Sequence, residues 1–327
     1  MSENDLVSIK DLRIHYCLHN STVKAVNGVS FDIKKGETFG LVGETGAGKT
    51  TISLGILRLL PDPPARVIEG SIEFNGKSIF KASDAEMRDI RGDQISMIFQ
   101  DPMTALNPIE TVGDQILECV ELHEKLSTAE AKERVYEIME MVGIPRERYG
   151  EYPHQFSGGM KQRIVIARAL VCRPELLIAD EPTTALDVTI QAQVLDMIQK
   201  IKEELGTSML LITHDLGIIA ETCDRVAVIY AGQIVEMGTT EQIYEDTLHP
   251  YTKGLFGAIP SLDTKSRRLI PIEGLMPDPA NLPTGCYFSP RCKQCMEICR
   301  RQEPPLADMG DGHMCRCFAV KGGNADA

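Results

Sequence analysis

The segment Gly43–Thr50 constrains this chain more than any other, because it fits the pattern G-x-x-x-x-G-K-[ST] that cradles nucleotide phosphates. The apolar run Thr38–Val42 before it predicts a buried parallel strand. The apolar positions between Thr51 and Leu60 follow helical spacing and predict a helix. The motif therefore lies between a strand and a helix, as a phosphate-binding loop requires, and we expect this chain to bind a nucleoside triphosphate.

Each position of this loop has an expected role. The residues expected to contact the nucleotide are Gly43, Glu44, Thr45, Gly46, Ala47, Gly48, Lys49, Thr50 and Thr51. The glycines let the backbone wrap closely around phosphates and aim N–H groups and a helix N-terminus at them. Lys49 adds a positive charge for the outer phosphates, and the Thr50 hydroxyl is an oxygen ligand of the kind that Mg²⁺ prefers. The alternative is a Gly-rich turn with a solvated lysine, which the full eight-residue match disfavours.

A second motif is a strand that ends in carboxylates. Leu176–Ala179 is apolar, and Asp180 and Glu181 follow directly. Asp180 is expected to reach Mg²⁺ through a bound water, and Glu181 to take a proton from an attacking water or orient it. An Asp-Glu-Pro turn after a strand is common, so this motif depends on the phosphate loop for its interpretation.

Ser157, Gly158 and Gly159 form a third motif, placed before a predicted helix through Val171. Ser157 is a good N-cap, and two glycines at a helix N-terminus make a second anion-binding nest. A single nucleotide site does not need two nests, so we expect this one to close on a nucleotide held by another subunit. The alternative is an ordinary N-cap preceded by a loop.

Composition limits the other partners. The chain has 327 residues, 34 Lys and Arg against 47 Asp and Glu, and a net charge of −13. This balance argues against wrapping nucleic acid and against adhesion to anionic lipid. The acidic start and the lack of a long apolar stretch favour a cytoplasmic protein, which a protein partner would have to hold at a membrane.

The remaining pattern predicts an α/β fold. Short strands with turn signals up to about residue 80 suggest an antiparallel sheet: residues 7–9, 12–16, 26–33 and 70–74, the last ending at Asn75-Gly76. Short apolar runs suggest a parallel sheet: residues 95–99, 176–179, 209–212 and 226–229. Residues 111–143 show helical spacing with a break at Leu126–Thr128, which predicts a helical insertion with a new N-cap.

Together these motifs resemble the ATP-binding subunits of ABC transporters over residues 6–260. The resemblance implies a P-loop ATPase core with an antiparallel β subdomain and a helical subdomain at about 101–170. The resemblance also implies roles for three single residues and one loop. Gln100, at a strand end, senses Mg²⁺ and the attacking water, and the switch histidine His214 hydrogen-bonds the γ-phosphate. Tyr16 stacks on adenine, and Ala185–Asp187 form the D-loop. Each has an ordinary alternative, which for Tyr16 is a half-buried strand tyrosine.

Three stretches narrow the resemblance to the dipeptide, oligopeptide and nickel importer branch: residues 99–108, 155–160 and 249–253, together with the ending Gly285–Cys292. The branch implies an ATPase bound at the cytoplasmic face of the membrane. Its implied partners are two integral-membrane permease subunits, a paralogous ATPase or a second copy, and an extracytoplasmic substrate-binding protein. The cargo is left open among dipeptides, longer peptides, nickel chelates and haem, because an ATPase does not touch it.

The family mechanism rests on incomplete sites. Each site takes Lys49, Thr50, Asp180 and Glu181 from one subunit and the nest at Ser157 from the other. ATP that binds the closed pair better than the open pair shifts the equilibrium towards closure, and attached permeases move with it.

After about residue 260 the sequence becomes rich in proline and cysteine. We expect residues 261–327 to be a small Cys-rich domain, either a disordered tail or a segment that a metal holds together. Cys286, Cys292, Cys295 and Cys299 are followed by Cys315 and Cys317, a density typical of metal or iron–sulfur sites in cytosolic chains. The irregular spacing favours a 4Fe-4S cluster over zinc.

The branch's ending matches four of these cysteines, which nominates Cys286, Cys292, Cys299 and Cys317 as ligands with Cys295 as the alternate.

Two other functions remain open at this stage. One is a non-transport ABC ATPase that acts on nucleic acid or the ribosome, which the acidic charge opposes. The other is a P-loop kinase, which has no need of the nest at Ser157.

Overall fold

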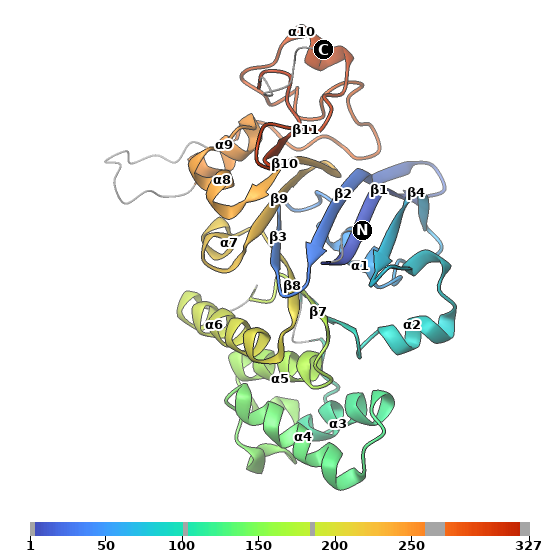
Figure 1. The fold of residues 1–327 in the computed structure, drawn as a ribbon, viewed down its shortest axis with the longest axis vertical. Helices are drawn as coiled ribbons and strands as arrows, with labels where there is room; N and C mark the ends of the chain where they lie inside the picture. The colour runs from blue at the N-terminus through green and yellow to red at the C-terminus, as the bar shows by residue number, and fades with distance from the viewer. Residues whose placement is uncertain (1–3, 101–103, 184–186, 259–271, 321–327) are drawn as a thin grey trace. The chain divides into compact units, whose positions relative to one another are not determined.

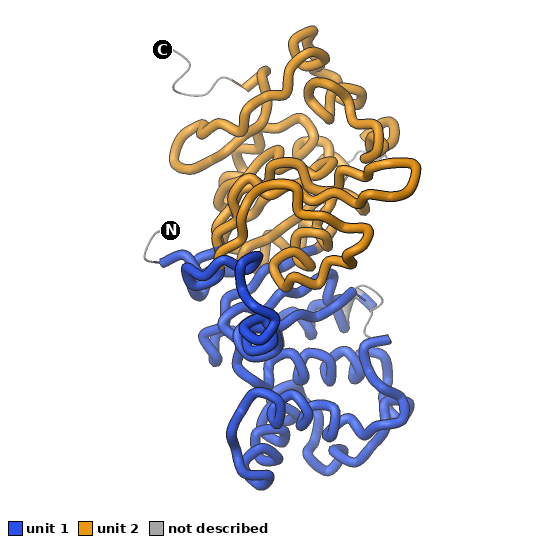
Figure 2. Tube along the Cα trace, turned by 90° about the vertical axis from the view of Figure 1, so that its right-hand side faces the viewer, with its two compact units in different colours: residues 1–7, 33–38, 74–212 blue, residues 8–32, 39–73, 213–327 orange. Residues whose placement is uncertain are grey.

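The computed structural model describes residues 4–100, 104–183, 187–258 and 272–320 (Figure 1). The chain divides into two compact units, each built from several separate segments (Figure 2). Unit 1 comprises residues 1–7, 33–38 and 74–212, and unit 2 comprises residues 8–32, 39–73 and 213–327. The predicted boundary at residues 260/261 lies outside the described residues and stays a prediction.

Each predicted run falls on an observed strand, but the strands at residues 77–78, 233–239, 307–308 and 314–315 were not predicted. The observed strands are β1 Asp5–Cys17, β2 Thr22–Lys34, β3 Thr38–Val42, β4 Ala65–Phe74, β5 Lys77–Ser78, β6 Ile95–Ile98, β7 Leu176–Asp180, β8 Ser208–Thr213, β9 Arg225–Tyr230, β10 Gln233–Thr239, β11 Ala307–Asp308 and β12 Met314–Cys315. The two strands predicted at residues 7–9 and 12–16 form one strand, β1. Asp11, between them, takes a φ of 49°, which an Asp tolerates better than most residues, so the strand continues past it.

The α-helices are α1 Lys49–Ile56, α2 Asp84–Ile90, α3 Val112–His123, α4 Thr128–Met141, α5 Gly158–Leu170, α6 Val188–Leu205, α7 Leu216–Thr222, α8 Thr240–Glu245, α9 Pro250–Gly257 and α10 Glu297–Arg301. Short 3₁₀ turns occupy Ile79–Lys81, Arg146–Arg148 and Pro153–Gln155. The break predicted before α4 is confirmed: Ser127 is its N-cap and forms a capping box with Glu130.

Unit 1 combines a parallel sheet with a group of helices. Strand β7 pairs in parallel with β6 on one side and β8 on the other, and every residue of β7 is buried. Helices α3, α4 and α5 pack on one another, as Figure 1 shows in green. Ile116, Val135 and Ile164, one on each helix, are fully buried. These helices lie within the range of about 101–170 predicted for a helical subdomain.

Unit 2 contains the antiparallel sheet and the phosphate loop. Its part of the sheet formed by β1, β2, β4 and β5 has the strand order β2-β1-β4. In the second sheet, β3 pairs in parallel with β9, β9 pairs antiparallel with β10, and β12 adds antiparallel to β10 with β11 beside it. Gly48, which begins α1, and the loop before it follow directly from the buried strand β3.

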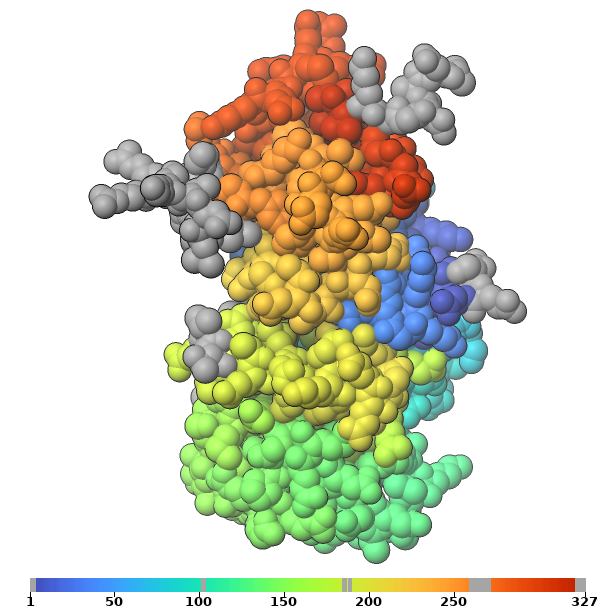
Figure 3. Space-filling model, turned by 60° about the vertical axis from the view of Figure 1, so that its left-hand side comes forward, coloured from blue at the N-terminus to red at the C-terminus, as the bar shows by residue number. Residues whose placement is uncertain are grey.

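Residues 272–320 are folded onto unit 2, which excludes the disordered-tail alternative for them. As the prolines predicted, they hold one short helix, α10, and two short strands in their described part. Figure 3 shows this segment in red against residues 225–258 in yellow and orange. Buried polar contacts contribute to this packing: Glu236 on β10, fully buried, lies 2.9 Å from Nε2 of His313.

Candidate functional site

The phosphate loop has a backbone that only glycine can supply. A Cβ atom on Gly43 would lie 2.2 Å from the carbonyl oxygen of Ile229, and one on Gly48 would lie 2.3 Å from that of Ala25. Gly48 also takes a φ of 101°, in the region that favours glycine. Helix α1 starts at once, so its N-terminal N–H groups lie at the end of the loop. This local geometry is that of an anion-binding loop.

Lys49 is folded back onto the loop. Its side chain is buried, and its Nζ donates to the carbonyl oxygens of Gly43 at 2.8 Å and Glu44 at 3.1 Å. The next residue, Thr50, is exposed, so its hydroxyl is accessible to a metal or phosphate oxygen. The Tyr16 hydroxyl lies 3.2 Å from Oγ1 of Thr51, which places Tyr16 beside the start of α1.

In unit 1, Glu181 and Gln100 meet at the ends of neighbouring parallel strands. Gln100 Nε2 donates to Glu181 Oε2 at 2.9 Å. Glu181 follows β7 with a φ of 48°, an uncommon conformation for a residue with a long side chain, and its N–H donates to the Ile212 carbonyl at 2.8 Å. Asp180 and Glu181 are both buried. Backbone strain of this kind is found at functional sites.

The nest at Ser157 lies on the surface of unit 1. Ser157 and Gly158 are exposed, and Gly159 is half-buried. Ser157 occupies the N-cap position of α5, yet within the described part of the chain no hydrogen bond from the helix N–H groups reaches its hydroxyl. In the same helix, Gln162 Nε2 donates to the Pro182 carbonyl at 2.5 Å, which links α5 to the segment after Glu181.

His214 comes directly after β8. It belongs to unit 2 and is exposed. Asp215 after it caps α7, with its carboxylate accepting from the N–H groups of Gly217 at 2.8 Å and Ile218 at 3.3 Å. Of the predicted D-loop, Ala185 and Leu186 lie outside the described residues, and Asp187 is the N-cap residue of α6. The phosphate loop, Tyr16 and His214 belong to unit 2 and the other predicted residues to unit 1, so their action on one nucleotide stays a prediction.

The predicted cluster cysteines lie in residues 272–320. Burial raises the pKa of the Cys286 thiol to about 11, and the thiols of Cys299, Cys317 and Cys292 add to this rise. In the described part of the chain, however, no group of three or more His, Cys, Asp or Glu side chains is close enough to hold a metal ion. None of the ten cysteines, all of which lie in the described residues, forms a disulfide.

Comparison with known proteins places the chain in a family. Residues 26–184 match the model of the ABC transporter family, and residues 235–299 match that of the oligopeptide/dipeptide transporter C-terminal region. The chain is 51% identical over 315 residues to the dipeptide transport ATP-binding protein DppD of Bacillus subtilis, covering 96% of this chain and 94% of that protein. This chain belongs to the ABC transporter family of ATP-binding proteins.

Other relatives of this ABC ATPase agree. It is 49% identical over 318 residues to the oligopeptide transport ATP-binding protein OppD of Bacillus subtilis, with 96% and 89% of the two chains covered. A dimeric ATP-binding cassette solved in a post-hydrolysis state with ADP and Pi shares 27% identity and a TM-score of 0.64, covering 72% of this chain and 98% of its own. The protein cbiO1 from Clostridium perfringens, part of the ABC transporter complex cbiONQ, gives a TM-score of 0.65 at 27% identity, with 75% of this chain and 92% of that chain covered.

Among the described residues, no helix of this ABC ATPase is long and apolar enough to cross a membrane.

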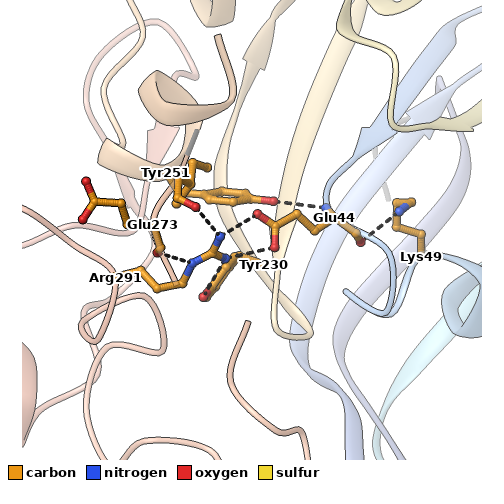
Figure 4. A network of polar contacts seen from close by, with 7 residues as sticks. Glu44, Lys49, Tyr230, Tyr251, Glu273 and Arg291 are labelled. Atoms are coloured by element: carbon orange, nitrogen blue, oxygen red, sulfur yellow. Dashed lines mark hydrogen bonds and ion pairs between the residues drawn. The ribbon is translucent and has the colours of Figure 1, made fainter. Parts of the chain in front are cut away.

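Sequence reasoning missed one group of residues near the phosphate loop. Arg291, Tyr230 and Tyr251 contact Glu44 or one another in Figure 4. Arg291 lies within the ending Gly285–Cys292, but no pattern in that stretch indicates a contact with the phosphate loop.

Proposed function

We propose that this chain is the ATP-binding and hydrolysing subunit that energises an importer of dipeptides or oligopeptides. The observation that carries the proposal is its similarity over 96% of its length to DppD and OppD, together with the matched C-terminal region named for oligopeptide and dipeptide transporters. Nickel chelates and haem stay open as cargoes. These relatives give no support to a function on nucleic acid or the ribosome.

The residues assigned to ATP fall into three groups. Gly43–Thr51 bind the phosphates, with Lys49 moving from the Gly43 and Glu44 carbonyls to the outer phosphates. Thr50 and Gln100, with Asp180 through water, hold Mg²⁺, which supplies charge neutralisation at the phosphates when bound. Glu181 takes a proton from the attacking water, and His214 contacts the γ-phosphate. The buried carboxylates and the Gln100–Glu181 hydrogen bond support these roles.

Two copies, or this chain and a paralogue, close on two ATP molecules. The exposed nest Ser157–Gly159 contributes to the nucleotide held by the other subunit. Its support is that the Ser157 hydroxyl is not used to cap its own helix, whereas Ser127 and Thr239 do cap theirs. ATP hydrolysis then removes the contacts that hold the pair closed, and the attached permeases follow.

The partners follow from this function. They are two integral-membrane permease subunits, a second ATPase subunit, and an extracytoplasmic substrate-binding protein. The chain acts at the cytoplasmic face of the membrane as a peripheral subunit. The helical subdomain α3–α5 is the proposed contact with the permeases, because it extends from the sheet that carries Gln100.

Cys286, Cys292, Cys299 and Cys317 are proposed to hold a 4Fe-4S cluster, with zinc as the alternative metal and Cys295 as the substitute ligand. The support is the chemistry of the donor set, because cysteine thiolates are the usual ligands of such clusters. The Cys286 N–H also donates to the Cys299 carbonyl at 2.7 Å, which keeps two of the proposed ligands together. When bound, such a cluster supplies a cross-link between chain segments, and a structural role is the simpler one.

One experiment tests the transport function directly. Cells that lack this subunit are complemented with the wild type or with Lys49→Ala, and uptake of a labelled dipeptide and a labelled oligopeptide is measured. The proposal expects wild-type uptake of one or both peptides and none with Lys49→Ala. Normal peptide uptake without the subunit, with loss of another cargo, contradicts the peptide assignment.

A further inference from the structure

An arginine of the C-terminal region makes an ion pair with the phosphate loop. Both arms of the Arg291 guanidinium contact the Glu44 carboxylate, Nη1 to Oε2 at 2.9 Å and Nη2 to Oε1 at 3.1 Å (Figure 4). The Arg291 side chain is 6% exposed and that of Glu44 30%. Paired, parallel contacts of this kind are the stronger form of ion pair and fix orientation as well as distance. The two residues are 247 positions apart in the sequence.

Other oxygen atoms besides those of Glu44 also hold the Arg291 guanidinium in place. Its Nε donates to the Glu273 carbonyl at 3.1 Å, and Nη2 donates to the Ile272 carbonyl at 3.4 Å. Its Nη1 also lies 3.4 Å from the Tyr230 hydroxyl. Since arginine offers five N–H donors in a fixed plane, this set of acceptors determines where the guanidinium lies.

Aromatic packing fixes the segment that carries Arg291. The buried ring of Phe288 contacts the rings of Tyr230 and Tyr251, with centroids 5.2 Å and 5.5 Å apart. The Tyr251 hydroxyl in turn accepts from the Glu44 N–H at 3.1 Å. The same group of residues therefore holds both the main chain and the side chain of Glu44.

Glu44 belongs to the loop that holds phosphates. Its carbonyl oxygen lies 3.1 Å from Nζ of Lys49, so its carboxylate is within one side chain's length of the phosphate-binding lysine. An unpaired carboxylate in this loop would repel a bound triphosphate, because like charges repel and screening is incomplete within about 8 Å at physiological ionic strength. Arg291 supplies the compensating charge.

We propose that Arg291 is a positioning residue for nucleotide binding, which neutralises Glu44 and fixes its place in the phosphate loop. The C-terminal region thereby contributes to ATP affinity without touching ATP. This inference rests on the proposed assignment of Gly43–Thr51 to the nucleotide phosphates. A contrasting role, in which Arg291 only stabilises the C-terminal region, predicts different behaviour in the same variants.

The experiment is a titration of the full-length protein with a fluorescent ATP analogue. The variants are Arg291→Ala, Glu44→Gln and the double variant, with Lys293→Ala as matched control. Lys293 lies two residues from Arg291 and makes an exposed ion pair with Glu273 at 3.2 Å, so its removal deletes a charge from the same segment. Lys49→Ala tests the loop assignment separately, since it should abolish binding whether or not Arg291 matters.

We expect Arg291→Ala to weaken binding about tenfold, and Glu44→Gln to bind at least as well as the wild type because it removes the repelling charge. Adding Glu44→Gln to Arg291→Ala should restore most of the lost affinity. The loss in Arg291→Ala should shrink as salt rises from about 50 mM to about 500 mM. Lys293→Ala should stay within twofold of wild type, roughly the usual range for an exposed pair.

Unchanged affinity in Arg291→Ala, or an equal loss with and without Glu44→Gln, would overturn the inference in favour of a purely structural role. If Arg291→Ala does not fold, Arg291→Lys replaces it: it keeps the charge but loses the paired contact, and should bind two- to fivefold more weakly, with wild-type salt dependence. Wild-type affinity in Arg291→Lys shows that charge suffices. A salt-dependent loss in Arg291→Lys contradicts the charge argument.

Discussion

The side-chain amide of Gln100 donates a hydrogen bond of 2.9 Å to the carboxylate of Glu181, across two parallel strands that end side by side. The proposed water-activating residue is thus held by a residue at the entrance to the helical subdomain. A movement of that subdomain would change the hydrogen bond on the carboxylate. Because α5 packs on β6, this contact would connect that helix with the proposed hydrolytic residue.

Replacing Glu181 by Gln tests the catalytic role. The amide keeps the size of the side chain but cannot accept a proton, so we expect ATP hydrolysis to fall about 10²-fold or more while ATP binding is retained. The measurement is steady-state phosphate release, with nucleotide affinity in parallel. Glu121→Gln, on the exposed face of α3, is the matched control and should hydrolyse ATP at the wild-type rate. Near-normal turnover in Glu181→Gln would refute the assignment.

Ser157 and Thr239 allow a comparison between two N-cap residues with different proposed roles. The Thr239 hydroxyl accepts from the Gln242 N–H at 3.2 Å, so Thr239→Ala should lower the free energy of unfolding by about 1 kcal/mol and leave ATPase activity unchanged. Ser157→Ala should leave stability within about 0.5 kcal/mol and lower ATPase activity about tenfold. Denaturant unfolding and phosphate release distinguish the two. A Ser157→Ala variant that loses stability but not activity contradicts the role across the subunit interface.

Single cysteine substitutions test the metal proposal. Cys286→Ser and Cys299→Ser should lose bound iron, and with it the broad visible absorbance of an iron–sulfur cluster, while Cys295→Ser and Cys315→Ser should keep both. Iron, sulfide and zinc are measured on protein purified without oxygen. Colourless wild-type protein with one zinc per chain would establish the alternative metal, and a metal-free, folded wild type would contradict both.

The buried His249 should account for part of the loss of folding stability at low pH. Burial lowers the pKa of His249 to about 3, and its Nδ1 accepts from the Tyr251 N–H at 3.1 Å, so the folded protein needs the neutral ring. The unfolded chain binds a proton here near pH 6.5, so the unfolded state gains stability as pH falls from about 6.5 towards 3. His249→Asn keeps an N-cap acceptor and removes this titration.

The slope of unfolding free energy against pH should therefore be shallower in His249→Asn than in the wild type between about pH 6.5 and 4. Denaturant unfolding at several pH values measures it. The exposed His154→Asn variant is the control and should keep the wild-type slope. Identical slopes in all three proteins would show that His249 is not held neutral.

Local patterns predicted much of the fold because they act over a few residues. The apolar runs around Leu176 and Leu210 became β7 and β8, and the Ser127–Glu130 signal became a capping box. The meeting of Gln100 with Glu181 also follows, since parallel strands end at the same edge of a sheet. These features depend on spacing, which a single sequence displays.

Contacts between distant segments were not predictable in this way. Nothing near Glu44 indicates that its partner is Arg291, and nothing near Glu236 indicates His313. Both depend on how the C-terminal region folds back onto unit 2, which local spacing does not encode. The few apolar residues after Pro260 led to the prediction of a metal-held or disordered segment. The sequence did not reveal how this segment packs, because ion pairs and the aromatic contacts of Phe288 have no periodic pattern.

The most direct test of the central claim is the mass of the Glu181→Gln protein in solution with and without ATP. Sedimentation measures this mass for the chain alone and for the chain co-expressed with the paralogous ATPase. Two half-sites predict that ATP converts single subunits into pairs holding two nucleotides, and that Ser157→Glu abolishes the pairs without abolishing nucleotide binding. A wild-type protein that stays monomeric with ATP under both conditions, and hydrolyses it at a rate per subunit independent of concentration, would contradict the account.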